Sequence, residues 1–347
     1  MGTESRSVPK RKGFSVEAAE KWLAEHYLGL LLVLVVAYAS VRLGAAFPLI
    51  GAPVFGIVLG MVLRTAVGVP EGCRAGVKWS GKRILQIAIV LLGAGYSLDK
   101  IWAAGAESIG LILMVLAIAF VITLGAGRFL GVESNLRHLI AFGTAFCGAS
   151  AIAAVSPVIA PKERDISYAI TTVFLCSLVA VVAFPLIGHA LGLPELDYGL
   201  WAGTSINDTS STVAAGFAYG EEAGQVATVV KLSRTLMLVP ALIIFSFISG
   251  RQGQRRTAGR FRLGKLVPWF LVGFLLASVL RTTGVFSPAL GDSINAWGRY
   301  AVVAALTGVG LGTDLREMRQ VSWQPMVLGV GAWLVMACAS LFVVMQR

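Results

Sequence analysis

The sequence predicts an all-α polytopic membrane protein, and three observations lead to this fold class. Hydrophobic residues make up 56% of the 347 residues, and only 14% are charged. Apolar runs of about 20 residues, each long enough to cross a bilayer as a helix, recur as far as the C-terminus. The alternating segments of about ten residues that are typical of outer-membrane barrels are absent. We therefore expect about 10–11 transmembrane helices.

The apolar runs place the candidate spans in order along the chain. These spans are 28–47, 50–66, 80–98, 108–129, 137–160, 165–191, 198–217, 223–248, 266–283, 290–312 and 324–345. Small and polar residues interrupt the spans 137–160 and 198–217, and unwound backbone is tolerated in a membrane where protein or water satisfies it. Each of these two spans either crosses or re-enters on the side from which it came.

The first 27 residues differ from the rest of the chain. They are rich in lysine and arginine and precede a long apolar run without a small-residue cleavage site, which favours a retained helix over a signal peptide. We expect residues 1–27 to form a cytoplasmic tail or an interfacial helix, and residues 28–347 to form one transmembrane transporter domain.

The net charge of +11 has a topological explanation. Basic residues concentrate in loops between spans and not in one aromatic-rich patch, so the positive-inside rule explains them better than nucleic-acid binding does. The rule places the N-terminus and the loops Arg74–Arg83, Arg128–Arg137 and Arg251–Lys265 in the cytoplasm. The predicted location is a membrane, crossed many times, with the lipid bilayer as partner and no nucleic acid.

Motifs for metal, cofactor or enzyme chemistry are missing. The four cysteines form no Cys-x-x-Cys pair, and the three histidines are widely scattered. The sequence contains neither His-Glu-x-x-His nor Gly-x-Ser-x-Gly. We therefore expect no metal site, no cofactor and no enzymatic activity.

An internal repeat divides the transmembrane region. The segment Gly93–Asp99 (Gly-Ala-Gly-Tyr-Ser-Leu-Asp) recurs as Gly308–Asp314 (Gly-Val-Gly-Leu-Gly-Thr-Asp), and Val62–Thr65 recurs as Val279–Thr282. The positive-inside rule places the first copy of the arginine in Val-Leu-Arg-Thr on the cytoplasmic side and the second outside. The copies then cross in opposite directions, which is the usual plan of secondary transporters. The repeat-related halves are 49–130 and 264–345.

A second pair of segments lies within the core motifs 137–161 and 198–248. Gly143–Ala151 and Gly203–Ser211 both open with Gly-Thr and reach a serine seven positions after the glycine. Glycine and hydroxyl residues permit helix breaks, so we expect backbone breaks near Gly143, Gly148 and Gly203. Such breaks expose helix N-termini that bind anions. Close packing of two helices through small residues is the alternative interpretation.

Lys231 and Arg234 lie in the apolar run 223–248 and share one face of its helix. A charged side chain at mid-bilayer costs about 2.5 kcal/mol or more, so such residues usually mark a function. Two cations against the single carboxylate of Asp208 leave about one positive charge for a bound anion. An internal ion pair between Asp208 and either cation is the structural alternative.

These residues give a candidate binding site for a small anion. Lys231 and Arg234 neutralise the substrate, since arginine suits oxyanions and lysine adds a point charge. Hydrogen bonds come from Asn207, Ser205, Thr209 and Ser150, and Asp208 tunes the site or couples transport to H⁺ or Na⁺. A Na⁺ or proton antiporter centred on Asp208 and a passive anion channel are the alternatives.

Three segments carry a family resemblance. Phe142–Ala154, Gly203–Gly216 and Val230–Pro240 resemble the YeiH-type family of proposed sulfate exporters, which is similar to the cation/proton antiporter and anion transporter superfamily. The resemblance implies a panel domain, a core domain with crossed broken helices, and an inner-membrane secondary transporter that works by alternating access. It suggests sulfate or a related sulfur oxyanion or sulfonate as substrate, and a homodimer by analogy.

Overall fold

The computed structural model describes residues 16–251, 268–314, 316 and 322–347. Residues 252–265 of the expected cytoplasmic loop Arg251–Lys265 and residues 1–15 of the N-terminal tail lie outside these residues. Within them, the chain forms helices joined by short connections, without a strand. The predicted all-α polytopic fold is confirmed.

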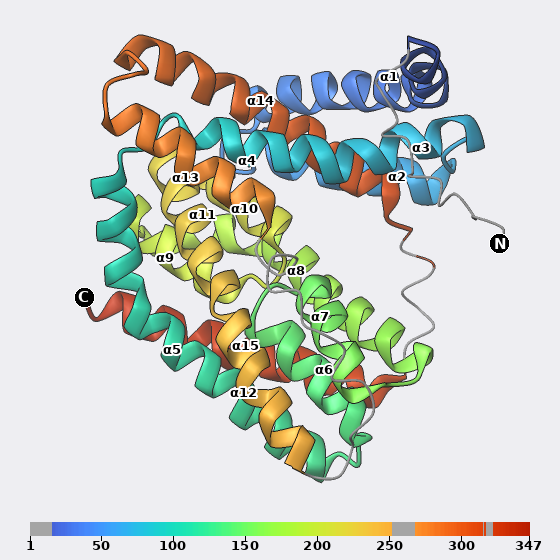
Figure 1. Cartoon of the computed structure of the whole chain (residues 1–347), viewed down its shortest axis with the longest axis vertical. Helices are drawn as coiled ribbons and strands as arrows, with labels where there is room; N and C mark the ends of the chain where they lie inside the picture. Colours follow the sequence, from blue (N-terminus) through green and yellow to red (C-terminus); the bar gives the residue numbers. More distant parts are fainter. Residues whose placement is uncertain (1–15, 252–267, 315, 317–321) are drawn as a thin grey trace, which may run out of the picture.

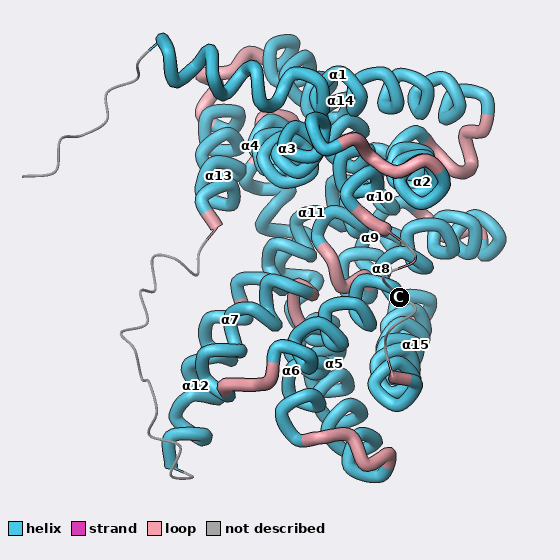
Figure 2. The backbone as a smooth tube through the Cα atoms, turned by 90° about the vertical axis from the view of Figure 1, so that its right-hand side faces the viewer, coloured by secondary structure: helices cyan, strands magenta, loops and turns pink. Residues whose placement is uncertain are grey.

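The helices form two layers (Figure 1). The first layer, which we call the panel, contains α1 (Val16–Ala46), α2 (Ala52–Ala66), α3 (Glu71–Trp79), the π-helical turn η1 (Ser80–Ile84), α4 (Leu85–Gly93), α13 (Trp269–Thr282) and α14 (Pro288–Gly312). The second layer, the core, contains α5 (Leu98–Phe129), α6 (Ser134–Ala145), α7 (Ala149–Ile159), α8 (Glu163–Leu191), α9 (Glu195–Ser205), α10 (Thr209–Tyr219), α11 (Glu221–Leu236), α12 (Leu238–Arg251) and α15 (Trp323–Met345). The core elements α6, α7 and α12 lie at the opposite end of the molecule from α1 and α3 (Figure 2).

Five of the helices in the described part of the chain are long and apolar enough to cross a membrane. Between 28% and 44% of their most apolar windows is buried, so much of their apolar surface faces outward. Phe129, for example, is 95% exposed. Exposed apolar side chains of this kind require lipid as their surroundings. The five spans are Trp22–Ala46, Leu98–Phe129, Glu163–Leu191, Glu221–Ile248 and Trp323–Met345.

The first span begins earlier than the sequence suggests. The expected boundary at residue 28 falls inside α1, which is helical from Val16. Trp22 stacks on His26 of the same helix, with ring centroids 4.5 Å apart, and meets the edge of Trp79 at 5.2 Å. Residues 22–26 therefore pack against α3 as part of the first crossing helix.

Close glycine contacts set the direction of α2 against α14. A Cβ at Gly56 would lie 2.9 Å from Thr307 Oγ1, and one at Gly60 would lie 2.7 Å from the backbone nitrogen of Leu311. Farther along, Arg64 Nε lies 4.0 Å from a carboxylate oxygen of Asp314. Residue numbers rise together along both helices, so α2 and α14 run parallel.

The second copy of the repeat makes the equivalent contacts. Trp269 Nε1 donates to Gln86 Oε1 at 3.2 Å, and the backbone N–H of Leu98 donates to Thr282 Oγ1 at 2.8 Å. Residue numbers again rise together from the first pair to the second, so α13 runs parallel to the segment from α4 to the start of α5.

The two parallel pairs oppose each other. A Cβ at Gly81 would lie 3.0 Å from the Val309 nitrogen, whereas one at Gly95 would lie 2.7 Å from Asn295 Cγ. Residue numbers rise along one helix and fall along the other, so the segment η1–α4 is antiparallel to α14. The pair α2 and α4 therefore runs opposite to its copies α13 and α14, as an inverted repeat requires.

The first re-entrant hairpin is formed by α6 and α7. Glu133, just before α6, lies 3.3 Å from Lys162 Nζ, and 3.9 Å from the guanidinium of Arg164, both just after α7. The two ends of the segment therefore meet, and the chain turns back at residues 146–148. The expected span 137–160 thus re-enters, which puts the run Pro161–Asp165 on the same side as the loop Arg128–Arg137.

The second hairpin is formed by α9 and α10. The backbone N–H of Ala223 donates to Glu195 Oε2 at 3.1 Å, and the Tyr219 hydroxyl donates to the Leu193 carbonyl. The expected span 198–217 therefore also re-enters, with its turn at residues 206–208. The connecting helix α8 has 29 residues and is about 43 Å long at 1.5 Å per residue, so the two hairpins enter from opposite sides.

The close contact of α2 and α14 generates a stability prediction. We expect Gly60→Ala to lower the thermal unfolding temperature of the purified protein, because the new methyl group meets backbone atoms of α14 at a cost of about 1–3 kcal/mol. Gly110→Ala in α5 is the matched control, since a Cβ there has open space. Equal unfolding temperatures for the two variants would contradict this account of the helix contact.

The hairpin topology can be tested by cysteine labelling. In a variant without the four native cysteines, Ser134→Cys and Glu163→Cys should both react with an impermeant maleimide from the cytoplasmic side. Glu222→Cys, at the start of α11, should react from the outer side. Labelling of positions 134 and 163 from opposite sides would show that α6 and α7 cross the membrane.

Candidate functional site

The tips of the two hairpins meet inside the core. A Cβ at Gly148 would lie 3.9 Å from the carbonyl carbon and oxygen of Asn207. Gly148 has φ of 63°, in the left-handed half of the backbone map, where glycine is favoured. Each tip ends one short helix and begins another. Two helix C-termini, of α6 and α9, and two N-termini, of α7 and α10, therefore converge at this crossover.

Lys231 of α11 joins the two tips. Its side chain is fully buried, and Nζ donates to the carbonyls of Phe146 at 2.8 Å, Ile206 at 2.8 Å and Asn207. The three acceptors lie at the ends of α6 and α9, where carbonyls lack partners within their own helix. One ammonium group thus uses its three donors to hold both hairpins.

Arg234, three residues after Lys231, also donates to backbone carbonyls of both hairpins, at positions in α6 and α9 that lie farther from the tips. Its Nε donates to the Ala145 carbonyl at 2.6 Å, one terminal nitrogen donates to the Thr204 carbonyl at 2.6 Å, and the other donates to the Thr144 carbonyl. The side chain is fully buried. The guanidinium group therefore bridges the last turn of α6 and the last turn of α9.

The helix ends at the crossover contribute partial charges of both signs. Each helix C-terminus carries about half a negative charge, so the ends of α6 and α9 together supply about one. The N-termini of α7 and α10 carry about one positive charge in return, so the two cations and Asp208 still leave about one positive charge for a bound anion. In the part of the chain that the structure describes, no carboxylate lies within 4.0 Å of Lys231 or Arg234, so the alternative of a direct ion pair is wrong.

Asp208 is the N-cap of α10. Its Oδ2 accepts from the backbone N–H of Ser211 at 3.0 Å and from the Ser211 hydroxyl at 3.2 Å. Its own backbone N–H donates to the Ser177 hydroxyl at 3.1 Å. Thr209, the first residue of α10, is half-buried. The carboxylate therefore occupies the positive end of a half-helix at the crossover.

The equivalent end of α7 has no such carboxylate. Aligning the Gly-Thr that opens each segment pairs Gly148 with Asp208, and Gly148 is the N-cap of α7 without a side-chain cap. Ala149 and Ser150, the first residues of α7, are exposed. The N-terminus of α7 is thus open to an external anion at the position where α10 has its own.

Several buried polar atoms at the crossover lack partners among the described residues. They are the side-chain oxygen and nitrogen of Asn207, the hydroxyl of Ser205 and the hydroxyl of Thr144. Buried polar groups are nearly always paired, so unpaired ones call for an explanation such as a ligand or water. Thr144 is a site residue that the sequence reasoning missed, although its position in the paired Gly-Thr motif could have indicated it.

The three predicted helix-breaking glycines divide into two kinds. Gly148 lies at a break, but Gly143 and Gly203 lie inside α6 and α9. A Cβ at Gly143 would lie 2.9 Å from Ile152 Cδ1, and one at Gly203 would lie 2.7 Å from Val230 Cβ. Both glycines permit close helix packing, which was the alternative interpretation of their motifs.

The core helix α15 supports the second tip from behind. Trp333 Nε1 donates to the Ser205 carbonyl at 3.1 Å, and the Ser340 hydroxyl lies 2.7 Å from the Thr204 hydroxyl. Neither residue was a sequence candidate, because nothing in their local patterns connects them with the distant segment 203–211. The tip of α9 and α10 is therefore held from two sides, by α11 and by α15.

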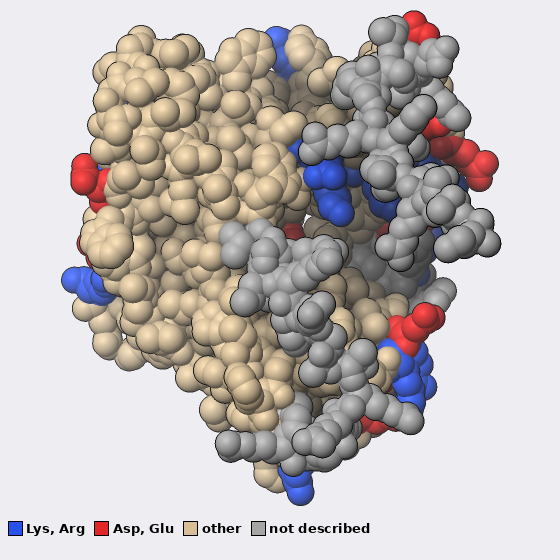
Figure 3. Space-filling view, viewed as in Figure 1, with Lys and Arg blue, Asp and Glu red and all other residues tan. Residues whose placement is uncertain are grey.

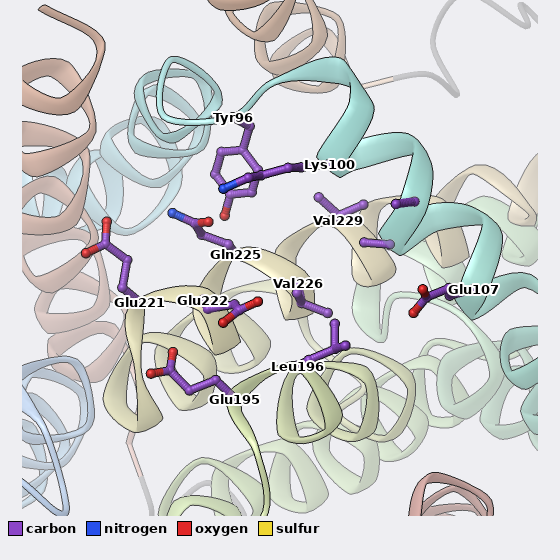
Figure 4. Close-up of a pocket in the computed structure, with 12 residues that line it drawn as sticks. Tyr96, Lys100, Glu107, Glu195, Leu196, Glu221, Glu222, Gln225, Val226 and Val229 are labelled. Carbon is purple, nitrogen blue, oxygen red and sulfur yellow. The ribbon is translucent and has the colours of Figure 1, made fainter. Parts of the chain in front are cut away.

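A cavity of about 550 Å³ opens beside α11, where α5 and α9 approach it (Figure 4). Glu195, Glu221, Glu222, Glu107 and Lys100 are among its lining residues. Figure 4 shows these side chains around the space between the helices. The cavity lies on the side from which the second hairpin enters, and it extends along α11 to Val229, two residues before Lys231.

Truncating either cation should destabilise the crossover. We expect Lys231→Met and Arg234→Met to lower the thermal unfolding temperature, because each buried carbonyl that loses its donor costs about 1–3 kcal/mol. The measurement is fluorescence-detected unfolding in detergent. Ser233→Ala, on the same helix, is the control and should unfold like the wild type. Unchanged stability in both methionine variants would show that the carbonyl contacts are energetically unimportant.

Comparison with known proteins places the chain in a family. The profile of a family described as "Conserved hypothetical protein 698" matches residues 28–329. A UPF0324 membrane protein of Clostridium tetani is 34% identical over 342 residues, covering 93% of this chain and 98% of that protein. UPF0324 membrane proteins of Streptococcus pneumoniae and Agrobacterium fabrum are each 35% identical, covering 92% and 86% of this chain and 97% and 87% of those proteins. The resemblance inferred from the three motifs is confirmed, and the chain belongs to the UPF0324 family of membrane proteins.

Proposed function

We propose that this protein is a secondary-active transporter of a small anion that works by alternating access. The observation that carries the proposal is the open N-terminus of α7 at the crossover of two re-entrant hairpins. Half-helix N-termini near the bilayer midplane bind anionic groups in several transporter folds. The family resemblance supports sulfate or a related sulfur oxyanion or sulfonate as the substrate class.

In this proposal the backbone and the small polar side chains contact the anion. The first N–H groups of α7 and the Ser150 hydroxyl face the open end, since Ala149 and Ser150 are exposed. Asn207 and Ser205 supply unpaired polar groups from the opposite tip, and Thr209 lies at the start of α10. These donors would replace part of the water shell that the anion loses in the membrane.

Lys231 and Arg234 then act as positioning residues, and their charge also attracts the anion. Their donors are engaged by backbone carbonyls, so direct contact with substrate would require those bonds to break. The buried cations would still lower the electrostatic cost of an anion at the crossover. Transport should therefore depend on them even though they do not bind the substrate directly.

The inverted repeat supports alternating access. The panel helices α2 and α4 run opposite to α13 and α14, so the same packing can be reproduced with the opposite side open. The cavity of about 550 Å³ beside α11 would be the outer opening in this state. The family resemblance implies the cytoplasmic membrane, and the positive-inside rule sets the orientation within it.

A Na⁺ or proton antiporter centred on Asp208 is the second candidate. Asp208 is the half-buried carboxylate at the crossover, and the contacts to Ser211 use only Oδ2. The other carboxylate oxygen could accept a cation. In the anion-transport proposal the same group would couple anion movement to H⁺ or Na⁺.

Flux through proteoliposomes tests the proposal. Purified protein should move radiolabelled sulfate, sulfite or taurine down an imposed gradient, and Ser150→Ala combined with Asn207→Ala should reduce that flux strongly, because contacts to the anion are lost. Thr235→Ala, whose hydroxyl bonds its own helix at Lys231, is the matched control. Uncoupled flux that ignores pH and Na⁺ gradients would indicate a channel instead.

Asp208→Asn separates the two candidates. If the protein is a cation antiporter, this variant loses proton- or Na⁺-driven pH changes in the vesicles, and no anion is required in the buffer. If it is an anion transporter, anion exchange persists in the variant, and only its dependence on the cation gradient changes.

A further inference from the structure

We propose that a cavity at the cytoplasmic ends of α2, α3 and α14 is a second anion-binding site, which takes a phosphate- or sulfate-bearing group. The cavity has a volume of about 400 Å³. Its lining includes Arg64, Arg74, Lys78 and Lys82. All of its lining residues belong to the panel and its connections, so the site is separate from the crossover of the two hairpins.

The charge of the cavity is not balanced by the described chain. Arg74 lies 3.5 Å from Glu71, whose side chain is almost fully exposed, and Arg64 lies 4.0 Å from Asp314. Lys78 and Lys82 make no ion pair with any described residue. Two lysines are therefore available to a ligand beside two weakly paired arginines.

The inverted repeat provides an internal comparison for Arg64. Its copy, Arg281, donates to the carbonyls of Ser287 at 3.3 Å and Pro288 at 2.7 Å and to the carboxylate of Asp292 at 3.0 Å. By contrast, Arg64 Nε is a buried atom without a hydrogen-bond partner among the described residues. The two arginines occupy equivalent positions, but only Arg281 is satisfied by its own chain.

An oxyanion is the ligand that fits this combination. The guanidinium fork pairs with phosphate or sulfate oxygens in two parallel hydrogen bonds, and the lysines add point charges. The π-helical turn η1 contributes Lys82, and such turns inside α-helices are frequent at functional sites. On the face seen in Figure 3, lysine and arginine side chains gather beside a hollow between the places where Figure 1 labels α4 and α2.

The same chemistry could come from a lipid or from a free ion. The cavity adjoins apolar residues that face outward, with Val62 54% exposed and Val67 78% exposed. Basic pockets between membrane helices on the cytoplasmic side bind anionic lipid head groups. A soluble oxyanion would instead enter from the cytoplasm.

Thermal unfolding of the full-length protein tests the site. In detergent, inorganic phosphate and sulfate are titrated at constant ionic strength. In nanodiscs, phosphatidylcholine with and without phosphatidylglycerol is compared, because a ligand of the folded state raises the unfolding temperature. We expect a saturable rise with the soluble oxyanions, or a rise only with phosphatidylglycerol, which would identify a lipid head group. Because the proposed crossover site also takes an oxyanion, the titrations are run in the Ser150→Ala/Asn207→Ala background, and either rise should be lost when Lys78→Gln/Lys82→Gln is added to it.

Two controls make the outcome decisive. Arg83→Gln removes a positive charge next to Lys82 but outside the cavity lining, and it should keep the full shift. Ser150→Ala/Asn207→Ala alone, which weakens the crossover site, should still show a saturable rise. The proposal is overturned if no probe gives a shift in the Ser150→Ala/Asn207→Ala background, or if adding Lys78→Gln/Lys82→Gln leaves that shift unchanged. Because the crossover variants are scored by flux and these variants by binding, the two proposals fail independently.

Discussion

The fold of the core depends on two buried cations that hold the backbone of two hairpins. Re-entrant helices end inside a membrane, where water cannot satisfy their last carbonyls and each unsatisfied group is costly. Lys231 and Arg234 donate to carbonyls at the ends of both α6 and α9. The hairpins, in turn, supply the acceptors and the negative helix ends that lower the free-energy cost of burying two cations.

The N-termini of α7 and α10 take no part in these contacts. With the C-termini satisfied, the two N-termini keep their positive ends directed at the tips. One of them is neutralised by Asp208, and the other begins with Gly148 and remains open. The asymmetry between two otherwise similar segments is the main physical reason to place an anion at α7.

The panel has a different organising constraint, which is close backbone approach. Glycines such as Gly60 and Gly310 let α2 and α14 lie against each other with backbone in contact, and equivalent contacts join α4 to α13. In lipid, where hydrophobic burial gives little association energy between helices, small residues and close packing supply it. Glycines and arginines of the repeat therefore lie at corresponding places in the two copies. The two copies differ in the hydrogen-bond partners that the chain gives to these arginines at the two membrane faces.

The sequence by itself determined the class of protein, the inverted repeat and the residues that meet at the crossover. The lengths of the apolar runs, the positions of the basic loops and the paired Gly-Thr segments are properties of short stretches of sequence. They can therefore be recognised without the three-dimensional structure. Tertiary structure alone decided that both doubtful spans turn back, because a crossing and a re-entrant segment have the same composition until their ends are seen together. It also decided what Lys231 and Arg234 contact, because backbone carbonyls and helix dipoles do not depend on residue type and cannot be identified from the sequence. The two helix C-termini and two helix N-termini at the crossover carry partial charges that largely cancel, so the positive charge left by the count of side-chain charges remains in the folded protein.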